Sequence, residues 1–448
     1  MAGGTFLSQN KVLPGVYINF SSNQNTGLSV SQRGVVAICE PMSWGPVAQM
    51  QTVPYGADTT PYCGYPIYAP QAQFLNEIFK GTDRTNPPYE VLLWRPAASS
   101  SSQATATKGS LTITALYPGA RGNDITVSVA ADPDNASSFI VKTYVDGVEV
   151  DRQTQENIQN LAANDWVTFS GTGALSAQVG ISLTGGADGT VENTAYPTFL
   201  TALEAYDFDI VIYDGTDATT QAAFTGFAER MSSNNGKNCQ VVMYNATAPD
   251  SRFTINLSGD MTGVTLSDGT ALTGQKLTWW VGGAEAGAQY DESLTYAVYP
   301  DATTVTPALT NDQISTGVQA GNLYLSNIEG SVRIVQDINS LTTFTQDITA
   351  PYQKNRIIRT LSTLANDLST QFAQGYIGIV DNNEDGRSLF KSAIVGYIRE
   401  MESNGAVTDF SPEDVEVLAG NSIDSIVINI NIQPVDAVEK IYITIYVN

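Results

Sequence analysis

The sequence Phe208-Asp209-Ile210-Val211-Ile212-Tyr213 is rich in β-branched and aromatic residues, and Asp214-Gly215 follows it as a turn signal. A helical pattern then covers 218–232, and a second apolar run covers 239–244. Parallel strands need a crossover connection, which is usually a helix. A strand, a helix and a strand in this order therefore predict a parallel α/β sheet.

Two earlier apolar runs, at 34–39 and 91–94, have the pattern of buried strands, and we expect them to join the same sheet. The composition changes at Pro96, where alanines and serines lead into a region that extends to residue 190. This region alternates apolar and polar residues between turn signals, as short antiparallel strands do. We interpret it as a small all-β module inserted into the α/β domain.

The C-terminal part of the chain combines helical and strand patterns. Apolar stripes at helical spacing run through 355–374 and 386–402, and the apolar run 376–380 between them has the pattern of a strand. Residues 426–432 place isoleucine at every second position, which also predicts a strand. These patterns together indicate an α+β domain.

We therefore expect a multidomain protein that combines α/β and α+β architecture, with an inserted all-β module and extended terminal arms. The expected segments, in chain order, are an N-terminal arm (1–20), the first part of the core domain (21–96), a β-sandwich-like module (97–190), an α/β domain (191–345), an α+β C-terminal domain (346–433) and a C-terminal arm strand (434–448).

The composition weakens several classes of function. The 448 residues include no histidine, and 45 acidic against 21 basic residues give a net charge of −24. Without histidine, a Ser-His-Asp or Cys-His hydrolase is excluded, and the usual imidazole metal ligand is missing. So acidic a surface repels phosphate backbones, which argues against nucleic-acid binding. Three cysteines without a C-x-x-C spacing indicate neither a disulfide framework nor a zinc site. We expect no catalytic residue, no metal and no cofactor.

Two short motifs invite a ligand-binding interpretation, and both are incomplete. Asp381-Asn382-Asn383-Glu384-Asp385-Gly386 opens like a calcium loop, but its twelfth position is Ser392 instead of glutamate. We interpret it as a turn that caps a helix. The Gly/Ala-rich stretch 282–288 lacks the G-x-G-x-x-G pattern, so we expect a helix whose small residues allow close packing.

The N-terminal residues Met1-Ala2-Gly3-Gly4-Thr5 contain neither the basic nor the apolar region of a signal peptide. No apolar run approaches the ~18 residues that a membrane span needs. We expect a chain that is made and folded in a cytoplasm and does not insert into a membrane.

Both ends of the chain carry alternating apolar residues. Val16, Ile18 and Phe20 share one strand face, and residues 441–447 alternate up to the last residue but one. Unpaired strands at chain ends can pair with another chain by adding to the edge of its sheet. The alternative is that both strands pair within their own chain, and the pattern alone leaves these two possibilities open.

The charge is distributed unevenly. Between residues 351 and 399, six basic and four acidic residues give +2 in a chain of −24. Such charges commonly lie on a solvated helix surface. The other interpretation is a positive face that docks an acidic partner.

The sequence also resembles the contractile tail sheath proteins of myophages and phage-tail-like particles, notably those of Gram-positive hosts. The segments that carry this resemblance span nearly the whole chain, and their order and end positions make it specific. They are Met1-Ala2-Gly3-Gly4-Thr5-Phe6, Pro14-Gly15-Val16-Tyr17-Ile18, Leu183-Thr184-Gly185-Gly186-Ala187-Asp188-Gly189-Thr190, Trp280-Val281-Gly282-Gly283-Ala284-Glu285-Ala286-Gly287, Asp381-Asn382-Asn383-Glu384-Asp385-Gly386-Arg387 and Pro434-Val435-Asp436-Ala437-Val438-Glu439-Lys440-Ile441-Tyr442.

The resemblance implies a structural protein. Subunits of this family form hexameric rings, stacked into a helical sheath around an inner tube, and contraction drives the tube through a target envelope. Baseplate and tail terminator proteins are the further partners, and the location is a virion or phage-tail-like particle, assembled in the bacterial cytoplasm. The middle α/β domain is expected to look subtilisin-like without being catalytic.

The resemblance also assigns candidate partner-binding residues. The terminal arms of the family exchange strands between neighbouring subunits, which gives Val16, Tyr17, Ile18, Phe20, Ile441, Tyr442, Ile443, Ile445 and Val447. The C-terminal domain of the family faces the tube, which gives the basic residues Lys354, Arg356, Arg359 and Lys391.

Two other classes of function remain open on the sequence. A β-rich surface or S-layer-like adhesin fits the composition but requires an export signal. A hydrolase that uses carboxylates alone is compatible with the many acidic residues, although no pair of them stands out.

Overall fold

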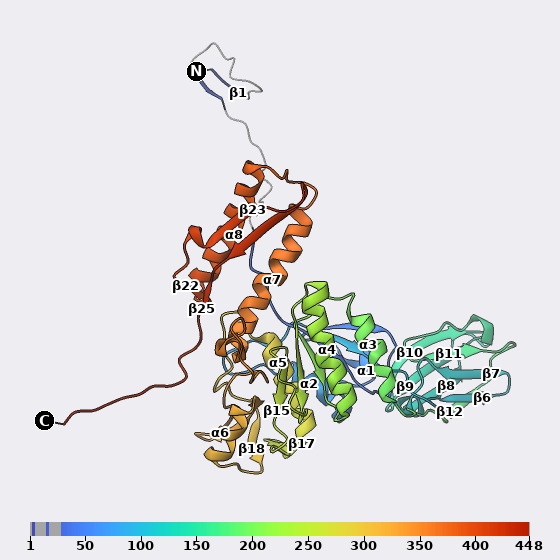
Figure 1. Cartoon of the computed structure of the whole chain (residues 1–448). Coiled ribbons are helices and arrows are strands. Elements are labelled where there is room, and N and C mark those ends of the chain that lie inside the picture. Colours follow the sequence, from blue (N-terminus) through green and yellow to red (C-terminus); the bar gives the residue numbers. More distant parts are fainter. Residues whose placement is uncertain (1, 5–14, 18–27, 448) are drawn as a thin grey trace. The chain divides into compact units, whose positions relative to one another are not determined.

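The computed structural model describes residues 2–4, 15–17 and 28–447 (Figure 1). The chain divides into two compact units. The larger unit contains Ser31–Asn366 and Pro434–Asn448, and the smaller contains Met1–Val30 and Asp367–Gln433. Each unit has its own secondary structure and is described separately.

A seven-stranded sheet forms the centre of the larger unit, with the strand order β19-β15-β14-β13-β3-β5-β4. All neighbours in it are parallel except β4 and β5, which are antiparallel. The strands are β3 (Val35–Cys39), β4 (Met50–Pro54), β5 (Glu90–Trp94), β13 (Ile210–Tyr213), β14 (Gln240–Tyr244), β15 (Thr254–Leu257) and β19 (Asn322–Leu323). Because β13 pairs directly with β3, the prediction that the early apolar runs join this sheet is confirmed.

Helices cover both faces of the central sheet. Alternate residues of β13 pack on opposite faces of the sheet. Ile210 and Ile212 belong to one hydrophobic core, and Val211 and Tyr213 belong to the other. The first core includes residues of α2 (Gln73–Ile78) and α5 (Leu277–Gly287), and the second includes residues of α3 (Tyr196–Leu203) and α4 (Ala218–Asn235). The strand-helix-strand pattern at 208–244 therefore produces the doubly covered sheet that it predicts.

The small residues of α5 pack as closely as predicted. A Cβ atom added to Gly282 would lie 2.4 Å from Cγ1 of Ile212, and one added to Gly283 would lie 2.0 Å from the carbonyl oxygen of Ile78. Both distances are far inside van der Waals contact, so only glycine allows this helix to approach the sheet and α2 so closely.

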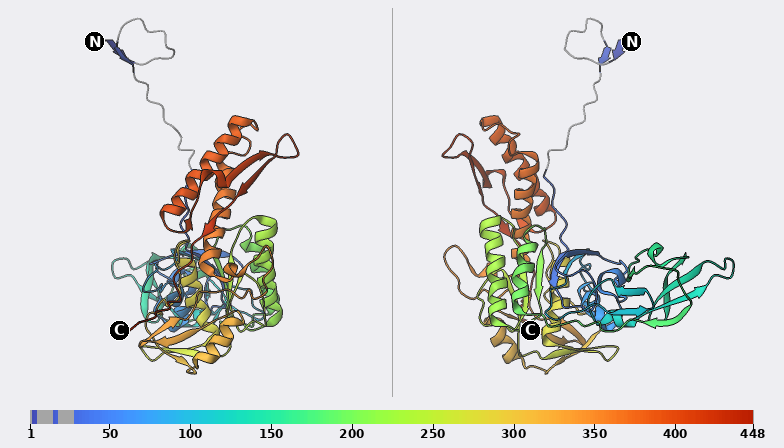
Figure 2. Two further views of the ribbon diagram at one scale, coloured as in Figure 1. Left: turned by 60° about the vertical axis from the view of Figure 1, so that its left-hand side comes forward. Right: turned by 90° about the vertical axis from the view of Figure 1, so that its right-hand side faces the viewer.

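The region after Pro96 contains the short strands that its pattern predicts. Two sheets, with the orders β10-β9-β8-β12 and β11-β7-β6, enclose a core that includes Ile113, Val127 and Val141. Figure 2 shows these strands grouped beside the central sheet. The strands are β6 (Thr105–Lys108), β7 (Leu111–Ala115), β8 (Ile125–Ala131), β9 (Phe139–Val145), β10 (Val148–Gln155), β11 (Val167–Ser170) and β12 (Gln178–Ser182).

The β module shares buried contacts with the α/β body. Trp44, from the loop after β3, is 1% exposed and belongs to the core of the module, where its ring centroid lies 4.7 Å from that of Trp166. Arg95, directly after β5, donates to the carbonyl oxygens of Gly45 at 2.9 Å and Pro118 at 2.7 Å. Buried side chains therefore fix the module to the body.

The rest of the larger unit is built from short elements. A three-stranded sheet has the order β17-β16-β18, and β20 and β21 form a hairpin. These elements are α1 (Thr60–Cys63), β16 (Gly263–Leu266), β17 (Ala271–Thr273), β18 (Ala302–Thr306), α6 (Asn311–Gln319), β20 (Leu325–Ile328) and β21 (Ser331–Ile334).

Two helices and a hairpin form the α+β fold of the smaller unit. Helix α7 (Asn355–Gly375) begins in the larger unit's residues and ends in the smaller unit's, and α8 (Glu384–Ser403) follows. Strands β23 (Val415–Ala419) and β24 (Ile426–Ile430) pair antiparallel. Two further short strands, β22 (Val407–Thr408) and β25 (Gln433–Pro434), complete the elements of this region.

The prediction of a strand at 376–380 is wrong. These residues form turns at the end of α7, where the N–H of Ile377 donates to the carbonyl oxygen of Phe372 and Gly378 has φ 76°. Tyr376, in the turn after α7, packs against α8, with its ring centroid 4.9 Å from that of Phe390. A short apolar run cannot by itself distinguish a strand from the end of a helix.

The interpretation of residues 381–386 as a helix cap is confirmed. The side chain of Asn383 accepts a hydrogen bond from the N–H of Gly386 at 2.8 Å, at the start of α8. Glu384 and Asp385 lie in the first helical turn, where the helix dipole favours negative charge.

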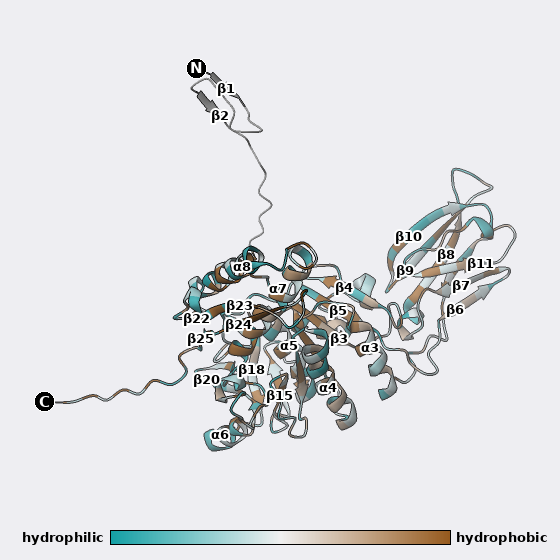
Figure 3. Ribbon diagram, turned by 45° about the horizontal axis from the view of Figure 1, so that its top comes forward, coloured by the Kyte–Doolittle hydropathy of each residue, from teal (hydrophilic) through white to brown (hydrophobic). Residues whose placement is uncertain are grey.

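The terminal segments differ from each other. Strands β1 (Ala2–Gly4) and β2 (Gly15–Tyr17) pair in parallel within the chain, whereas Ile18 and Phe20 lie outside the described residues. Residues 435–447 have no regular secondary structure in the single chain, and Figure 3 shows the segment as an extended trace. Ile441 is 76% and Val447 93% exposed. The expected C-terminal strand is therefore not formed within this chain by itself.

Among the residues that the structure describes, no helix has both the length and the apolar composition that crossing a membrane requires.

Candidate functional site

The C-terminal arm is attached to the larger unit at Glu439. The carboxylate of Glu439 accepts hydrogen bonds from Oγ1 of Thr295 at 2.7 Å and Nε2 of Gln336 at 2.6 Å, and it forms an ion pair with Nζ of Lys354. The side chain of Glu439 is 11% exposed and that of Lys354 is 19% exposed. We call these four residues the arm anchor.

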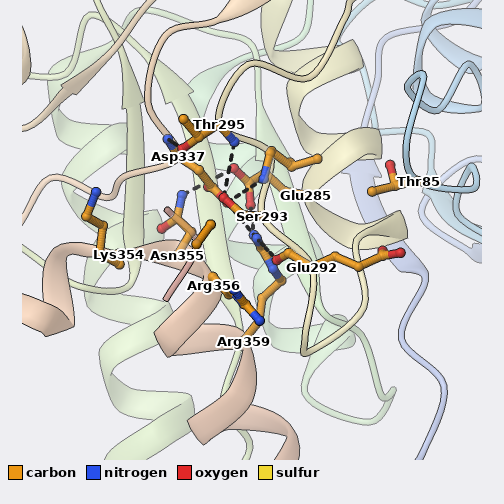
Figure 4. Close-up of polar contacts among 12 residues, drawn as sticks. Thr85, Glu285, Glu292, Ser293, Thr295, Asp337, Lys354, Asn355, Arg356 and Arg359 are labelled. Atoms are coloured by element: carbon orange, nitrogen blue, oxygen red, sulfur yellow. Dashed lines mark hydrogen bonds and ion pairs between the residues drawn. The ribbon is translucent and has the colours of Figure 1, made fainter. Parts of the chain in front are cut away.

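A buried ion cluster lies next to the arm anchor (Figure 4). Arg359 of α7 pairs through Nη1 with Oε2 of Glu285 at 2.6 Å and through Nη2 with Oδ2 of Asp337 at 2.5 Å. Nη2 also donates to the carbonyl oxygen of Glu292 at 2.7 Å. The side chains of Arg359 and Glu285 are fully buried, so their contact lies in a low-dielectric interior.

Thr295 connects the arm anchor to this cluster. Its Oγ1 atom accepts a hydrogen bond from the N–H of Asp337 at 3.0 Å, while the same hydroxyl donates to Glu439. Oδ2 of Asp337 accepts from the N–H of Leu294 at 2.9 Å as well as from Arg359. Hydrogen bonds thus run without interruption from the arm to the guanidinium of Arg359.

The two carboxyl groups of the cluster have opposite pKa shifts. Burial, reinforced by the neighbouring Asp337, raises the pKa of Glu285 well above its usual range. Burial also opposes ionisation of Asp337, but the charge and hydrogen bonds of Arg359 outweigh it and keep the pKa of Asp337 low. The opposite shifts favour the negative charge on Asp337, which balances Arg359, over a charge on Glu285.

The structure separates the four basic residues that the sequence groups together. A surface role for Arg359 is wrong, because its guanidinium is enclosed between two acidic side chains. Lys354 is engaged by Glu439 and lies 4.0 Å from Asp436. Arg356 is partly exposed in the larger unit, and Lys391 is partly exposed in the smaller unit.

Sequence reasoning missed the arm anchor and the ion cluster. The partners of Arg359 lie 74 and 22 residues away along the chain, and Thr295 lies 144 residues from Glu439. Glu439 is one of 45 acidic residues in the sequence, and a single glutamate is not distinctive. No local spacing brings these groups together.

In the smaller unit, β23 and β24 form a two-stranded sheet. Val415 pairs with Ile430 and Ala419 with Ile426, and among the described strands neither β23 nor β24 has a second neighbour. Each strand therefore has one edge with unpaired backbone groups. Such edges are the places where a further strand can add.

Comparisons with known proteins cover nearly the whole chain. Three family models match: the phage tail sheath protein beta-sandwich domain over residues 99–188, the central domain over 189–340 and the C-terminal domain over 347–448. The phage-like element PBSX protein XkdK of Bacillus subtilis is 33% identical over 477 residues, with 100% of each chain covered.

Solved structures agree with these matches. The sheath tail protein of Desulfitobacterium hafniense is 41% identical, with 96% of this chain and 99% of that chain covered, at a TM-score of 0.85. The helical sheath of the anti-feeding prophage in its contracted state shares the fold, with a TM-score of 0.57 at 12% identity over 97% of this chain and 99% of that one. The chain belongs to the family of phage tail sheath proteins, which are structural components of contractile tails and injection systems.

Proposed function

We propose that this chain is the subunit of a contractile sheath that polymerises around an inner tube by exchanging β-strands between subunits. The observation that supports this proposal is the C-terminal arm. It is attached to the body at Glu439, and from Lys440 to Val447 every residue is exposed. An alternating apolar segment in this state is ready to pair with another chain.

The energetics of a single arm are nearly balanced. Burying Ile441, Ile443, Ile445 and Val447 gains ~6–12 kcal/mol at ~1.5–3 kcal/mol each. Ordering a seven-residue segment costs a similar ~7–14 kcal/mol of backbone entropy. Backbone hydrogen bonds and several simultaneous neighbours must therefore favour the exchanged state, so assembly is expected to be cooperative.

The hairpin of β23 and β24 is a suitable acceptor for exchanged strands. Its two open edges can each receive a strand. Along β24, Ile426, Ile428 and Ile430 are partly buried while Val427 and Asn429 are exposed. Residues 441–447 have the same period of two, so an added arm can continue the apolar face of the hairpin. Val16 and Tyr17 of β2, with Ile18 and Phe20, are proposed for the second edge.

We assign the contact with the inner tube to the smaller unit. Lys391 of α8 is partly exposed there, and a positive charge on that face complements acidic groups on a tube. Arg356 remains a second candidate. Hexameric rings, a baseplate and a tail terminator complete the proposed assembly, which forms in the bacterial cytoplasm and becomes part of a virion or phage-tail-like particle.

Sedimentation and electron microscopy of the full-length chain test strand exchange. We expect chains that lack residues 1–20 or 441–448 to remain unassembled under conditions in which the full chain forms tubes. A matched pair sharpens the test: Ile443→Asp places a charge on the alternating apolar face, and Thr444→Asp places the same charge on the other face. Truncated chains that assemble as well as the intact chain would falsify the proposal.

A further inference from the structure

We infer that Glu439 is the point at which tension along the exchanged arm enters the α/β body. This inference rests on the proposed strand exchange, because only an exchanged arm is pulled by a neighbour. Two observations define the point: Glu439 is 11% exposed and hydrogen-bonded, whereas residues 440–447 are all exposed. The exchanged segment therefore begins at Lys440.

The three partners of Glu439 come from separate parts of the larger unit. Thr295 lies between α5 and β18, Gln336 follows β21, and Lys354 precedes α7. A carboxylate with donors from three segments forms charge-assisted hydrogen bonds, which are stronger than neutral ones. Pulling on the arm must break these bonds together, and so the load is shared by three segments of the body.

Thr295 presents an oriented hydrogen-bond donor to the carboxylate of Glu439. A threonine hydroxyl has one proton, and the N–H of Asp337 already donates to Oγ1 of Thr295. The proton of Thr295 is therefore left for Glu439, at 2.7 Å. Since Asp337 is fixed by Arg359, the buried ion cluster keeps this hydroxyl in place, and Thr295 acts as a positioning residue.

The first experiment measures whether the anchor restrains the arm in the full-length chain. Trypsin removes residues 441–448 by cutting after Lys440, and the attached residues before Lys440 should hinder access to the protease. We expect Thr295→Val and Glu439→Gln to speed this cut about tenfold, as loss of a hydrogen bond to a charged group implies. Intact mass follows the loss of these residues.

Two matched variants serve as controls. Thr295→Ser keeps the hydroxyl, so trypsin should cut this variant at the wild-type rate. If the change of packing alone were responsible, trypsin would cut Thr295→Ser faster as well. Glu192→Gln removes the same charge at an exposed position and should leave the rate unchanged. Melting curves confirm that each variant is folded. Cutting rates that do not change in Thr295→Val and Glu439→Gln overturn the anchor.

The second experiment measures assembly by sedimentation of the same variants. We expect Thr295→Val and Glu439→Gln to shift the concentration for assembly upward about tenfold, although their exchanged segment is intact. Faster cutting with normal assembly would overturn the role in transmitting tension. The proposed strand exchange has its own readout, because deletion of 441–448 leaves the anchor residues untouched: assembly of that deletion refutes strand exchange, and the cutting rates still report on the anchor.

Discussion

The larger unit carries two attachments of opposite kinds, the β module and the C-terminal arm. The module is attached through Trp44 and Arg95, which are almost completely buried and bind rings and backbone carbonyls. The arm is attached through Glu439, a partly hydrated carboxylate that leaves the following residues exposed. Burial of large side chains makes a permanent joint, whereas a single polar anchor fixes one point and leaves the rest of the segment exposed.

A second arginine strengthens the joint of the module. Arg121 donates through Nε to the carbonyl oxygen of Gly64 at 3.0 Å and pairs with Asp146 at 2.7 Å. Its guanidinium lies 4.2 Å from the ring centroid of Tyr65. The module must then move with the α/β body, which makes it a rigid projection of the body instead of a loosely tethered domain.

The largest expected effect tests the joint of the module. Trp44→Ala should destabilise the module by about 4 kcal/mol, because it removes a buried aromatic side chain and leaves a cavity. Denaturant unfolding followed by far-UV circular dichroism measures the change. Tyr68→Ala removes an exposed aromatic side chain and is the control, with little effect expected. A loss below about 1 kcal/mol in Trp44→Ala would contradict a packed joint.

The next effect concerns the ion cluster beside the arm anchor. Asp337→Asn should cost about 3 kcal/mol, the lower end for breaking a buried pair, because Glu285 stays in contact with Arg359 as a second acidic partner. Glu285→Gln should cost less than Asp337→Asn, since the raised pKa of Glu285 favours its neutral form in the folded chain and glutamine is neutral as well. Thermal unfolding of both variants provides the measurement, and equal losses of stability would contradict the opposite pKa shifts of the two carboxyl groups.

A smaller effect is expected at the arm anchor itself. Glu439→Gln should reduce the stability of the larger unit by about 1 kcal/mol, because the pair with Lys354 is partly solvated. Denaturant unfolding measures this loss. The comparison of the two attachments predicts that Glu439→Gln changes stability little and assembly clearly. A loss of stability as large as that of Trp44→Ala would contradict the distinction between the two attachments.

The last expected effect is a dependence on pH. The folded pKa of Glu285 is raised, so its contribution to stability is complete below the unfolded value of 4.5 and decreases as pH rises through the folded pKa. The melting temperature of the wild type should therefore fall relative to that of Glu285→Gln as pH is raised from about 5 to about 9. Parallel curves for the two proteins would show that Glu285 is ionised throughout.

The central sheet could be predicted from sequence because each strand carries its own local signal. Residues 208–213 are apolar on both faces, as expected for a strand covered by helices on both sides. Arg359 could not be assigned in this way. Its helical stripe and its charge are visible in the sequence, but the acidic partners that allow its burial come from α5 and from the segment after β21.

The joint of the module and the arm anchor were missed for the same reason. Trp44 lies in a loop with no periodic pattern, and its partner Trp166 is in another part of the chain. The alternation of the exposed arm, in contrast, is visible in the sequence itself, because it depends on no contact with a distant part of the chain. Local periodicity therefore identified the segment that leaves the body but not the residues that anchor it.

The anchor also sets a length scale for the polymer. Eight residues, 440–447, follow Glu439 in the described chain, and at 3.3–3.6 Å per residue they reach at most about 29 Å. Under the proposed strand exchange, an acceptor edge on a neighbouring subunit must lie within this tether of Glu439. The proposal then implies that the rise and twist between subunits are limited by chain length as well as by the shapes of the bodies.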